Sequence, residues 1–458
     1  MEKEEILFII DAQRKFFASG KTLNTEFRLT ILKKLRSLII KHEQEIVDAL
    51  WKDFHKPEFE VIVTETRFVI KEINNAIRNL RQWVKSKRVY TPLVHFISHS
   101  FVFPQPYGQV LILSPWNFPF QLAFVPLVGA IAAGNCAILK VSGQVPYTAG
   151  IIDKILGSLP GELVALIKGD HTTNDLLLDQ KFDYIFFTGS PRVGKYIMKK
   201  AADNLTPVSL ELGGKNPCVV AADARLDYAA KRIAWGKLIN CGQTCVSPDY
   251  VLIDDKVKDK FLELITREIR LFYGDNPEQS DDFARVISSE NVHRLSGLMK
   301  SGNIVTGGIS DADSRYVAPT IITDVKPGDP IMQEEIFGPV LPVIVFERFE
   351  EVYNIIEQNP KPLATYIFTR DKKLVREFLK RTRSGNTAVN ETVLQIASPY
   401  LPYGGIGTSG IGRYHGKKSF ETFSNLRSVL VKSNLLDLWL RYPPYSKYKT
   451  KIVSFLMR

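Results

Sequence analysis

Two cysteines lie four residues apart in the stretch NCGQTCVSPDY at 240–250, in a chain of 458 residues that has only four cysteines. Such a pair can be two packing thiols, half of a metal site, or the source of a nucleophile. A metal site would need two further ligands, and no second Cys/His pair has a suitable spacing. The helical pattern over 226–240 places Cys241 at a buried helix end, whereas Cys245 follows Gly242 in a polar loop. We therefore expect no metal, a packing role for Cys241, and a cleft-facing Cys245 that reacts as a thiolate.

Two other side chains could assist a nucleophile. Glu211 lies in the apolar stretch LELGGKNP, where burial would raise its pKa and suit it to act as a general base near neutral pH. A buried ion pair is the structural alternative for this carboxylate. Asn117, in SPWNFPF at 114–120, is held between prolines and aromatic residues at the end of a predicted strand. Its amide could donate to an oxyanion, although an asparagine in a turn is the more ordinary interpretation.

The stretch FFTGSPRVGK at 186–195 is typical of a strand that runs through a glycine turn into a helix. Ser190 can cap this helix and Pro191 suits its first position. The free N–H groups of a helix N-terminus attract phosphate. The glycines, Gly189 and Gly194, do not form the usual G-x-G-x-x-G pattern, so a packing turn remains the alternative to a phosphate site.

Two further stretches could hold parts of a nucleotide. Lys140 ends the predicted strand CAILK, where its ammonium could reach ribose hydroxyls or phosphate, or simply cap a sheet edge. The stretch QEEIFGPV at 333–340 offers Glu334 and Glu335, whose carboxylates can each accept two hydrogen bonds from a sugar diol. Phe337, in the same turn, can pack on a flat heterocycle.

The elements that must position these groups alternate along the chain. Residues 24–87 show helical spacing of apolar residues, and the β-branched, aromatic segment that follows predicts a hairpin arm and a first sheet strand. From 107 to 221, continuously apolar strands alternate with helices, which indicates a parallel sheet covered on both faces. Such sheets bind ligands beyond the carboxyl ends of their strands. The alternation resumes from 226 to about 385 and predicts a second α/β domain.

The composition, with 45% hydrophobic and 24% charged residues, is that of an ordinary soluble enzyme. The net charge of +11 is spread among acidic residues without a nucleic-acid-binding motif, so we expect no nucleic-acid partner. The start MEKEEILFII lacks a secretory signal, and the apolar run at 122–134 predicts a buried helix. The four cysteines form no disulfide framework, which favours the cytoplasm. The basic tail from Arg441 is short and would make at most peripheral contact with a membrane.

Five stretches together resemble the motifs of the NAD(P)-dependent aldehyde dehydrogenases, in the same order and spacing: PWNFPF, FTGSPRVG, LELGGKNP, NCGQTCVSPDY and EEIFGPV. The stretches RYHGKKSFETFS at 413–424 and RYPP at 441–444, and the lack of a long N-terminal extension, resemble the class 3 branch, which includes fatty and aromatic aldehyde dehydrogenases and whose soluble members are homodimers. The resemblance implies an α/β fold with four parts: a Rossmann-type cofactor domain (1–83 and 105–210), an α/β catalytic domain (211–395), a β-arm for oligomerisation (84–104 and 418–435) and a basic tail (436–458).

The resemblance also implies a reaction, the oxidation of a medium- or long-chain aliphatic or aromatic aldehyde to its acid. Cys245 would attack the aldehyde, and the Asn117 side chain and the Cys245 backbone N–H would hold the thiohemiacetal oxyanion. Hydride transfer to nicotinamide would leave a thioester, and Glu211 would activate the water that releases the acid. His415, in the class 3 tail motif, could line the site. The rival interpretations are a cysteine esterase or thioesterase without a redox step, and a catalytically idle binding protein on the same fold.

For the cofactor, NAD or NADP, the resemblance implies contacts of Lys140 with the adenosine ribose, of Ser190 with the pyrophosphate, and of Glu335 and Phe337 with the nicotinamide ribose and ring. The other positions assigned to the cofactor are Trp116, Gly143, Gly189, Gly194 and Leu212. The family usually has Lys-Pro-Ser-Glu where this chain has KVSG at 140–143, so Gly143 replaces a carboxylate that grips the ribose of NAD and repels the extra phosphate of NADP. We therefore expect NADP to be used at least comparably to NAD, unless Asp170 or Asp175 fills the vacancy.

Overall fold

The N-terminal part of the chain is helical in the computed structural model, which describes residues 2–95, 97–437 and 439–456. Residues 1, 96, 438, 457 and 458, which belong to the predicted first domain, arm and tail, lie outside the described residues. The helices are α1 (Lys3–Ala18), α2 (Thr25–Lys41), α3 (Glu43–Phe54), the single turn α4 (Glu58–Val61) and α5 (Arg67–Trp83). The predicted helical region from residue 24 is confirmed: α2 begins after Asn24, whose side chain accepts hydrogen bonds from the N–H groups of Glu26 and Phe27. Helix α1 was not predicted.

The first large sheet has the strand order β17-β7-β6-β3-β4-β5. Its parallel strands are β3 (Gln109–Ser114), β4 (Cys136–Val141), β5 (Val164–Ile167), β6 (Tyr184–Gly189) and β7 (Val208–Leu212), and the short β17 (Gly410–Ile411) joins antiparallel to β7. The connecting helices are α6 (Gln121–Ala133), α7 (Pro146–Leu156), α8 (His171–Leu178) and α9 (Pro191–Ala202). All residues of α6 are buried, as the apolar run predicts.

Successive side chains of these strands alternate between two cores, because β-strand residues point to opposite faces of a sheet. In β3, Val110 and Ile112 belong to the main core, which extends into the second sheet, whereas Leu111 and Leu113 pack with Ile6 and Ile10 of α1. Both faces of this sheet are therefore covered, which confirms the prediction from its continuously apolar strands.

The second large sheet has the order β10-β13-β14-β9-β8-β15-β16 and is parallel except at β10. The strands are β8 (Pro217–Val220), β9 (Tyr250–Asp254), β10 (Asn303–Thr306), β13 (Thr320–Thr323), β14 (Val340–Phe346), β15 (Ala364–Phe368) and β16 (Asn386–Val389). The helices are α10 (Leu226–Leu238), α11 (Lys258–Tyr273), α12 (Ser289–Leu298), α13 (Pro330–Gln333), α14 (Phe349–Gln358) and α15 (Lys372–Arg381); β11 (Ser310–Asp311) and β12 (Tyr316–Val317) form a small separate hairpin. The predicted second α/β unit is confirmed.

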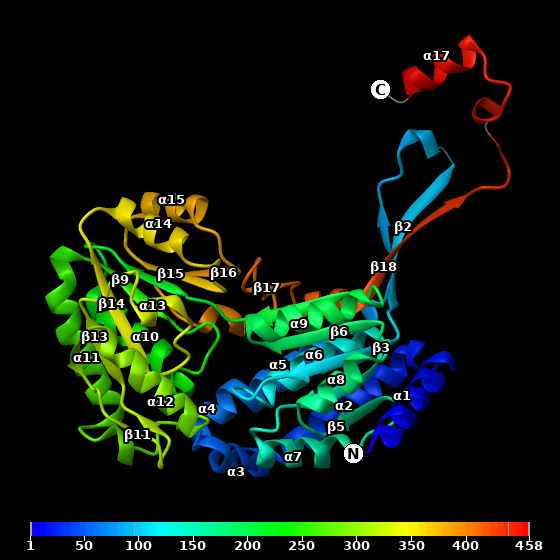
Figure 1. Ribbon diagram of the computed structural model, residues 1–458. Helices are drawn as coiled ribbons and strands as arrows, with labels where there is room; N and C mark the ends of the chain where they lie inside the picture. Colours follow the sequence, from blue (N-terminus) through cyan, green and yellow to red (C-terminus); the bar gives the residue numbers. More distant parts are fainter. Residues whose placement is uncertain (1, 96, 438, 457–458) are drawn as a thin grey trace.

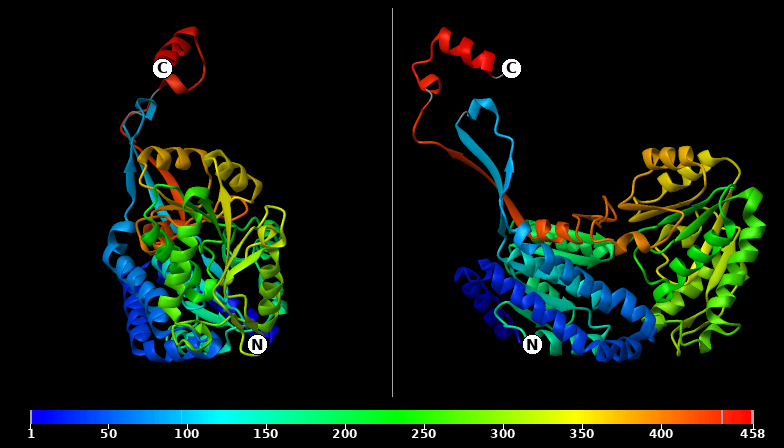
Figure 2. Two further views of the ribbon diagram at one scale, coloured as in Figure 1. Left: turned by 90° about the vertical axis from the view of Figure 1, so that its left-hand side faces the viewer. Right: turned by 180° about the vertical axis from the view of Figure 1, so that it is seen from behind.

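An antiparallel arm projects from the side of the first sheet, and the chain continues beyond it to its C-terminal helix (Figures 1 and 2). Its strands are β1 (Lys87–Val89), β2 (Ser98–Pro106) and β18 (Ser424–Lys432), with β18 paired to β2 over nine residues. Helix α16 (Lys417–Thr422) precedes β18, and α17 (Lys447–Leu456) follows it. No helix within residues 2–95, 97–437 and 439–456 is long and apolar enough to cross a membrane. The limits of the domains stay a prediction.

Candidate active site

Helix α10 carries the chain from the surface to the two cysteines. It ends at Leu238, and in the turn Ile239–Gly242 both Asn240 and Cys241 adopt positive φ, 55° and 54°. Gly242 also has positive φ, and a Cβ there would lie 2.3 Å from the carbonyl oxygen of Gly338. This tight turn buries Cys241 completely, as predicted, and leads the chain to Cys245, which is only half-buried.

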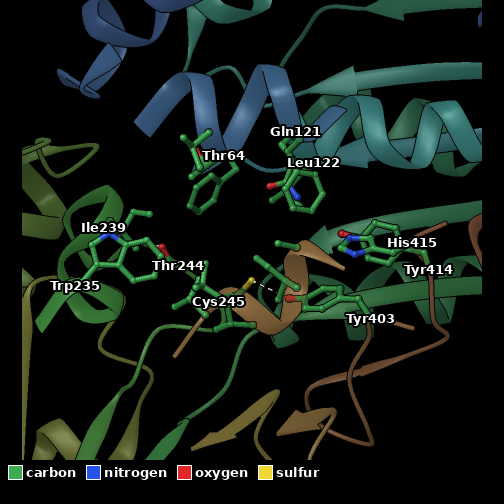
Figure 3. Close-up of a pocket in the computed structure, with 18 residues that line it drawn as sticks. Thr64, Gln121, Leu122, Trp235, Ile239, Thr244, Cys245, Tyr403, Tyr414 and His415 are labelled. Carbon is green, nitrogen blue, oxygen red and sulfur yellow. Dashed lines mark hydrogen bonds between the residues drawn. The ribbon is translucent and has the colours of Figure 1, made fainter. Parts of the chain in front are cut away.

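Cys245 lies on the wall of two cavities. The first is largely apolar, and none of its described lining residues is Asp, Glu, Lys or Arg; the labelled residues of Figure 3 surround it. The second, of about 240 Å³, lies at the carboxyl ends of β3, β6 and β7 and contains eight of the predicted residues: Trp116, Asn117, Gly189, Ser190, Glu211, Cys245, Glu335 and Phe337. The nucleophile candidate therefore connects an apolar chamber to a polar one.

Among the residues that the structure describes, the hydrogen-bond partner of the Cys245 sulfur is the Tyr403 hydroxyl, at 3.3 Å (Figure 3). Burial raises the pKa of Cys245 to about 12, and the hydrogen bond to Tyr403 opposes that rise. This burial disfavours the thiolate that the sequence predicts for Cys245, because the loop is polar in sequence but packed in space; the reactivity of Cys245 stays a prediction. Within the described residues, no group of three or more His, Cys, Asp and Glu side chains could hold a metal ion.

The Asn117 amide is tied to the loop that carries the nucleophile. The side-chain Nδ2 of Asn117 donates to the backbone carbonyl oxygen of Gln243 at 3.0 Å, and the backbone carbonyl oxygen of Asn117 accepts from Asn240 Nδ2 at 2.8 Å. Gln243 is held in turn by its side-chain bonds to the carbonyl oxygens of Asn240 and Arg285. An amide group has two N–H donors, so the second donor of Asn117 remains for a ligand in the cavity that it lines with Cys245.

Glu211 is the penultimate residue of β7 and is 3% exposed. Neither carboxylate oxygen has a hydrogen-bond partner among the described residues, so the buried ion pair considered from the sequence is not formed. Burial raises the pKa of Glu211 well above its usual value, and the charge of Arg413 opposes this. Arg413 itself donates to the carbonyl oxygens of Gly404 and Gly385.

A buried clamp joins the nucleophile loop to the loop of Glu335. Lys215 Nζ contacts Asp249 Oδ2 at 2.5 Å and donates to the carbonyl oxygens of Ile331 and Glu334, and Asp249 Oδ1 accepts from the N–H of Ile336.

Asn216, next to Lys215, holds the nucleophile segment directly. Its Nδ2 donates to the carbonyl oxygens of Cys245 and Ser247, and its Oδ1 accepts from the N–H of Ala364. Sequence reasoning missed Asn216, Lys215 and Asp249, although all three lie in the quoted motifs. The sequence did contain one indication of their role, because each of the three is a polar residue next to an apolar strand.

Glu335, Phe337 and Trp116 form the far side of the polar cavity. The rings of Trp116 and Phe337 meet edge to face, with centroids 5.4 Å apart. A Cβ at Gly213 would lie 2.0 Å from Glu335 Oε2, so only glycine leaves room for this carboxylate. Burial raises the pKa of Glu335 to about 8. Ser190 caps α9, as predicted, with its hydroxyl accepting from the N–H of Val193.

Four of the predicted cofactor residues lie outside the polar cavity. Gly143 lines a separate cavity of about 220 Å³ with Lys168 and Gly169. Lys140 is buried nearby; burial lowers its pKa, and the charge of Asp170 opposes this. Gly194 packs on Leu212: a Cβ at Gly194 would lie 2.8 Å from Leu212 Cδ2, so these two residues set the distance between helix and strand.

The two aspartates suggested for the vacancy at Gly143 have other partners. Asp170 caps α8 by accepting from the N–H groups of Thr172 and Thr173, and Asp175 accepts from the Tyr196 hydroxyl at 2.8 Å. Both carboxylates are thus engaged in local hydrogen bonds.

His415 lines the apolar cavity and is 2% exposed. Its ring stacks on Tyr403 with centroids 5.1 Å apart and an angle of 14° between the planes. No side-chain hydrogen bond reaches either ring nitrogen in the described chain; burial lowers the pKa of His415 to about 3, and the backbone of Ile396 opposes this. It is therefore a neutral ring that supports Tyr403.

Comparisons with known proteins agree with this architecture. The model of the aldehyde dehydrogenase family matches residues 1–429. The chain is 42% identical over 440 residues to 4,4'-diaponeurosporen-aldehyde dehydrogenase of Staphylococcus aureus, covering 95% of this chain and 96% of that one. It is also 42% identical to aldehyde dehydrogenase family 3 member B1 of Homo sapiens, covering 97% and 96%, and to the dimeric NADP-preferring aldehyde dehydrogenase of Canis lupus familiaris, covering 95% and 97%.

Among solved structures, the substrate-bound state of Staphylococcus aureus AldH matches with a TM-score of 0.96 and 41% identity over 99% of both chains. An NADP-dependent enzyme of E. coli matches with a TM-score of 0.88 and 25% identity, covering 94% of this chain and 91% of that one. Members of the matched family oxidise aldehydes to carboxylic acids with NAD or NADP. The chain belongs to the aldehyde dehydrogenase family and is a class 3-like, NAD(P)-dependent oxidoreductase that acts on aldehydes.

Proposed function

We propose that Cys245 is the nucleophile of the reaction, that the Asn117 amide and the Cys245 backbone N–H hold the oxyanion, and that Glu211 is the base for hydrolysis. The observation that carries this assignment is the position of Cys245 on the wall of both cavities. An aldehyde entering the apolar cavity meets the sulfur at the point where the polar cavity with Asn117 and Glu211 begins. Cys241 has no such access, because it is completely buried.

In the first step, the sulfur bonds to the aldehyde carbon and the thiol loses its proton. Glu335 and Glu211 line the same cavity as this thiol, so in their ionised forms they are the carboxylates placed to accept the proton. Asn117 Nδ2–H and the Cys245 N–H donate to the oxygen of the thiohemiacetal.

When bound, NAD or NADP supplies the hydride acceptor that turns the thiohemiacetal into a thioester. Glu211 then removes a proton from water, the water oxygen bonds to the thioester carbon, and the bond to sulfur breaks to release the acid.

The polar cavity suits the cofactor. Besides the edge-to-face pair Trp116 and Phe337, its wall carries the Thr188 hydroxyl, which is buried and has no partner among the described residues. Trp116, Glu335 and Phe337 would hold the nicotinamide and its ribose. Gly189, Ser190 and the first turn of α9 would hold the pyrophosphate, because a helix N-terminus attracts anions.

Both NAD and NADP would be used. The cavity beside Gly143 has no carboxylate among its described lining residues, and it has an ammonium group, Lys168, which pairs with Asp153 at 2.6 Å. A phosphate on the adenosine ribose would therefore meet no negative charge from the cavity wall. The relative from Canis lupus familiaris is named as NADP-preferring, which supports this expectation.

The substrate class we propose is a medium- or long-chain aliphatic or an aromatic aldehyde. The wall of the apolar cavity includes Phe68, Phe118, Leu122 and Trp235. A polar substrate would lose its hydrogen bonds to water there and would find few protein partners in their place. The test is kcat/KM for aldehydes of graded length, measured as reduced cofactor formed. Rates should rise with apolar length, and a preference for short polar aldehydes would contradict the proposal. Ester hydrolysis without any aldehyde oxidation would instead favour the rival hydrolase.

We propose that the protein is a homodimer in the cytoplasm. The projecting arm, with its exposed Leu426, Leu430 and Val431, supports dimerisation, as does the word dimeric in the name of the relative from Canis lupus familiaris. The four free cysteines are compatible with a reducing compartment. Light scattering would test the dimer, and a monomer at micromolar concentration would contradict it.

The tail beyond the arm suits peripheral contact with an anionic membrane. Trp439, Tyr445 and Phe455 are 59%, 74% and 77% exposed, and α17 carries Lys447, Lys449 and Lys451. Exposed aromatic and basic side chains gathered in one short segment favour reversible binding to an anionic surface. High salt should release the protein from vesicles, and a fraction that stays bound in high salt would contradict peripheral binding.

A further inference from the structure

Another polar cavity lies at the carboxyl ends of β15 and β16 and beside the starts of α10 and α15. Its volume is about 650 Å³. Five basic side chains line it: Arg225, Arg232, Arg370, Lys372 and Arg376. None of its described lining residues carries a carboxylate. It shares no lining residue with the two cavities that meet at Cys245.

The positive charge of this cavity is only partly neutralised. Arg225 pairs with Asp227 at 2.9 Å, and Arg232 lies 3.6 Å from Glu391. Arg370, Lys372 and Arg376 form no ion pair within the described residues, although all three are exposed beside the same cavity. Three like charges gathered in one hollow repel one another and raise the local concentration of anions. A multivalent anion would relieve this repulsion.

The loop that carries Arg370 is held in place. Both oxygens of Asp223 are engaged there: one accepts from the Thr369 hydroxyl at 2.7 Å and the other from the Arg370 N–H at 2.8 Å. Asn390 and Thr369 exchange two hydrogen bonds of 2.9 Å across the strand ends. The guanidinium groups therefore extend from a fixed backbone, which lowers the entropy lost when they bind a ligand.

One wall of the cavity also offers an aromatic surface. The Tyr228 ring is 45% exposed, and the guanidinium carbons of Arg225 and Arg232 lie 4.0 Å and 5.0 Å from its centroid. Guanidinium groups pair with phosphate through two parallel N–H donors, and they keep this geometry better than ammonium groups do. Four of the five basic residues are arginines.

We propose that this cavity binds a small phosphate-bearing dianion or polyanion, at a site separate from the cofactor. The phosphate groups would lie among Arg370, Lys372 and Arg376, and an organic part, where the ligand has one, would lie against Tyr228. Inorganic pyrophosphate and an aromatic phosphate ester both carry the phosphate groups that such basic side chains bind.

The experiment is isothermal titration of the full-length protein with inorganic pyrophosphate at constant ionic strength. The protein is first saturated with NADP, so that the cofactor's own phosphate site is blocked. The test variant is Arg370→Gln/Lys372→Gln/Arg376→Gln. The matched control, Lys33→Gln/Lys34→Gln/Lys41→Gln, removes the same charge from exposed lysines of α2 that form no ion pair in the described chain.

Wild type and control should bind one pyrophosphate, and the test variant should bind at least tenfold more weakly. Tighter binding of phenyl phosphate than of inorganic phosphate by wild type would identify an organic ester as the natural ligand class, and the reverse order an inorganic one. The aldehyde oxidation rate of the test variant should equal that of wild type, which shows that the variant is folded. If the test variant does not fold, the single variant Arg376→Gln is used in its place, and its affinity for pyrophosphate should fall by a smaller factor.

The proposal fails if wild type binds no pyrophosphate, if the test variant binds it as tightly as wild type, or if the control loses as much affinity as the test variant. If light scattering gives the test variant a different molecular mass from wild type while its pyrophosphate binding is unchanged, the cavity is instead an interface between copies of the chain.

Discussion

Replacing Tyr403 by Phe removes one hydroxyl, 3.3 Å from Cys245 Sγ, and keeps the ring that stacks on His415. In the wild type, burial raises the pKa of Cys245 to about 12, and the Tyr403 hydroxyl is the group that opposes this most. A hydrogen bond to a charged group contributes about 1.5–3 kcal/mol. At about 1.4 kcal/mol for each pKa unit, the pKa of the thiol should rise further by about one to two units in the variant. At a fixed pH the thiolate fraction should then fall roughly ten- to a hundredfold.

The assay is alkylation of Cys245 by iodoacetamide without cofactor, followed by mass spectrometry of the peptide at several pH values. Because the thiolate is the reactive form, the alkylation rate of Tyr403→Phe should be lower by the same roughly ten- to hundredfold factor. Cys241 is completely buried and serves as an internal control that should stay unmodified while the protein is folded. Equal alkylation rates in wild type and variant would refute the reasoning, because the hydroxyl would then contribute nothing to the state of the sulfur.

Three further changes test other parts of the site. Glu211→Gln should keep a burst of reduced cofactor while turnover falls roughly a hundredfold or more. Because burial raises the pKa of Glu211, wild-type turnover should rise with pH, and the variant should lose that rise. Unchanged turnover in the variant would remove Glu211 as the base. Gly143→Glu should shift the ratio of kcat/KM values toward NAD, since a Cβ there meets nothing nearer than the Gly169 oxygen at 3.9 Å; a wild-type preference for NAD above about a hundredfold, about 2.7 kcal/mol, or an unmoved ratio would contradict dual use. Asn216→Ala removes three buried hydrogen bonds and should lower the free energy of unfolding by about 3–5 kcal/mol in urea titrations, whereas a loss below about 1 kcal/mol would mean that other groups hold the loop.

Much of the fold could be predicted because its signals are local. The continuously apolar strands from 107 to 221 required a sheet covered on both faces, and the run at 122–134 could only be a buried helix. Two elements escaped this reasoning for physical reasons. Helix α1 buries a narrow stripe, Ile6, Ile10 and Gln13, against the sheet behind a surface of mixed charge. Strand β17 has only two residues, Gly410 and Ile411, and it is defined by pairing with β7, about two hundred residues earlier.

The site could be predicted in part for a related reason. Asn117 and Glu211 are near the carboxyl ends of parallel strands, so the topology brings them to one edge. Tyr403 and Arg413 come from the irregular segment after residue 400, where no periodic pattern indicates which side chains turn inward. The effect of burial on the pKa of Cys245 was not predicted, because it depends on packing around the sulfur, and a polar loop sequence does not reveal that packing.

The central claim is that Cys245, and not its neighbour Cys241, forms the covalent intermediate in aldehyde oxidation. The most direct measurement is formation of reduced nicotinamide from an apolar aldehyde by three proteins: wild type, Cys245→Ala and the matched control Cys241→Ala. Only Cys245 lines the cavities, so Cys245→Ala should show no oxidation, while Cys241→Ala should keep most of the wild-type rate. Equal loss of activity in the two variants, or oxidation that persists in Cys245→Ala, would contradict the account.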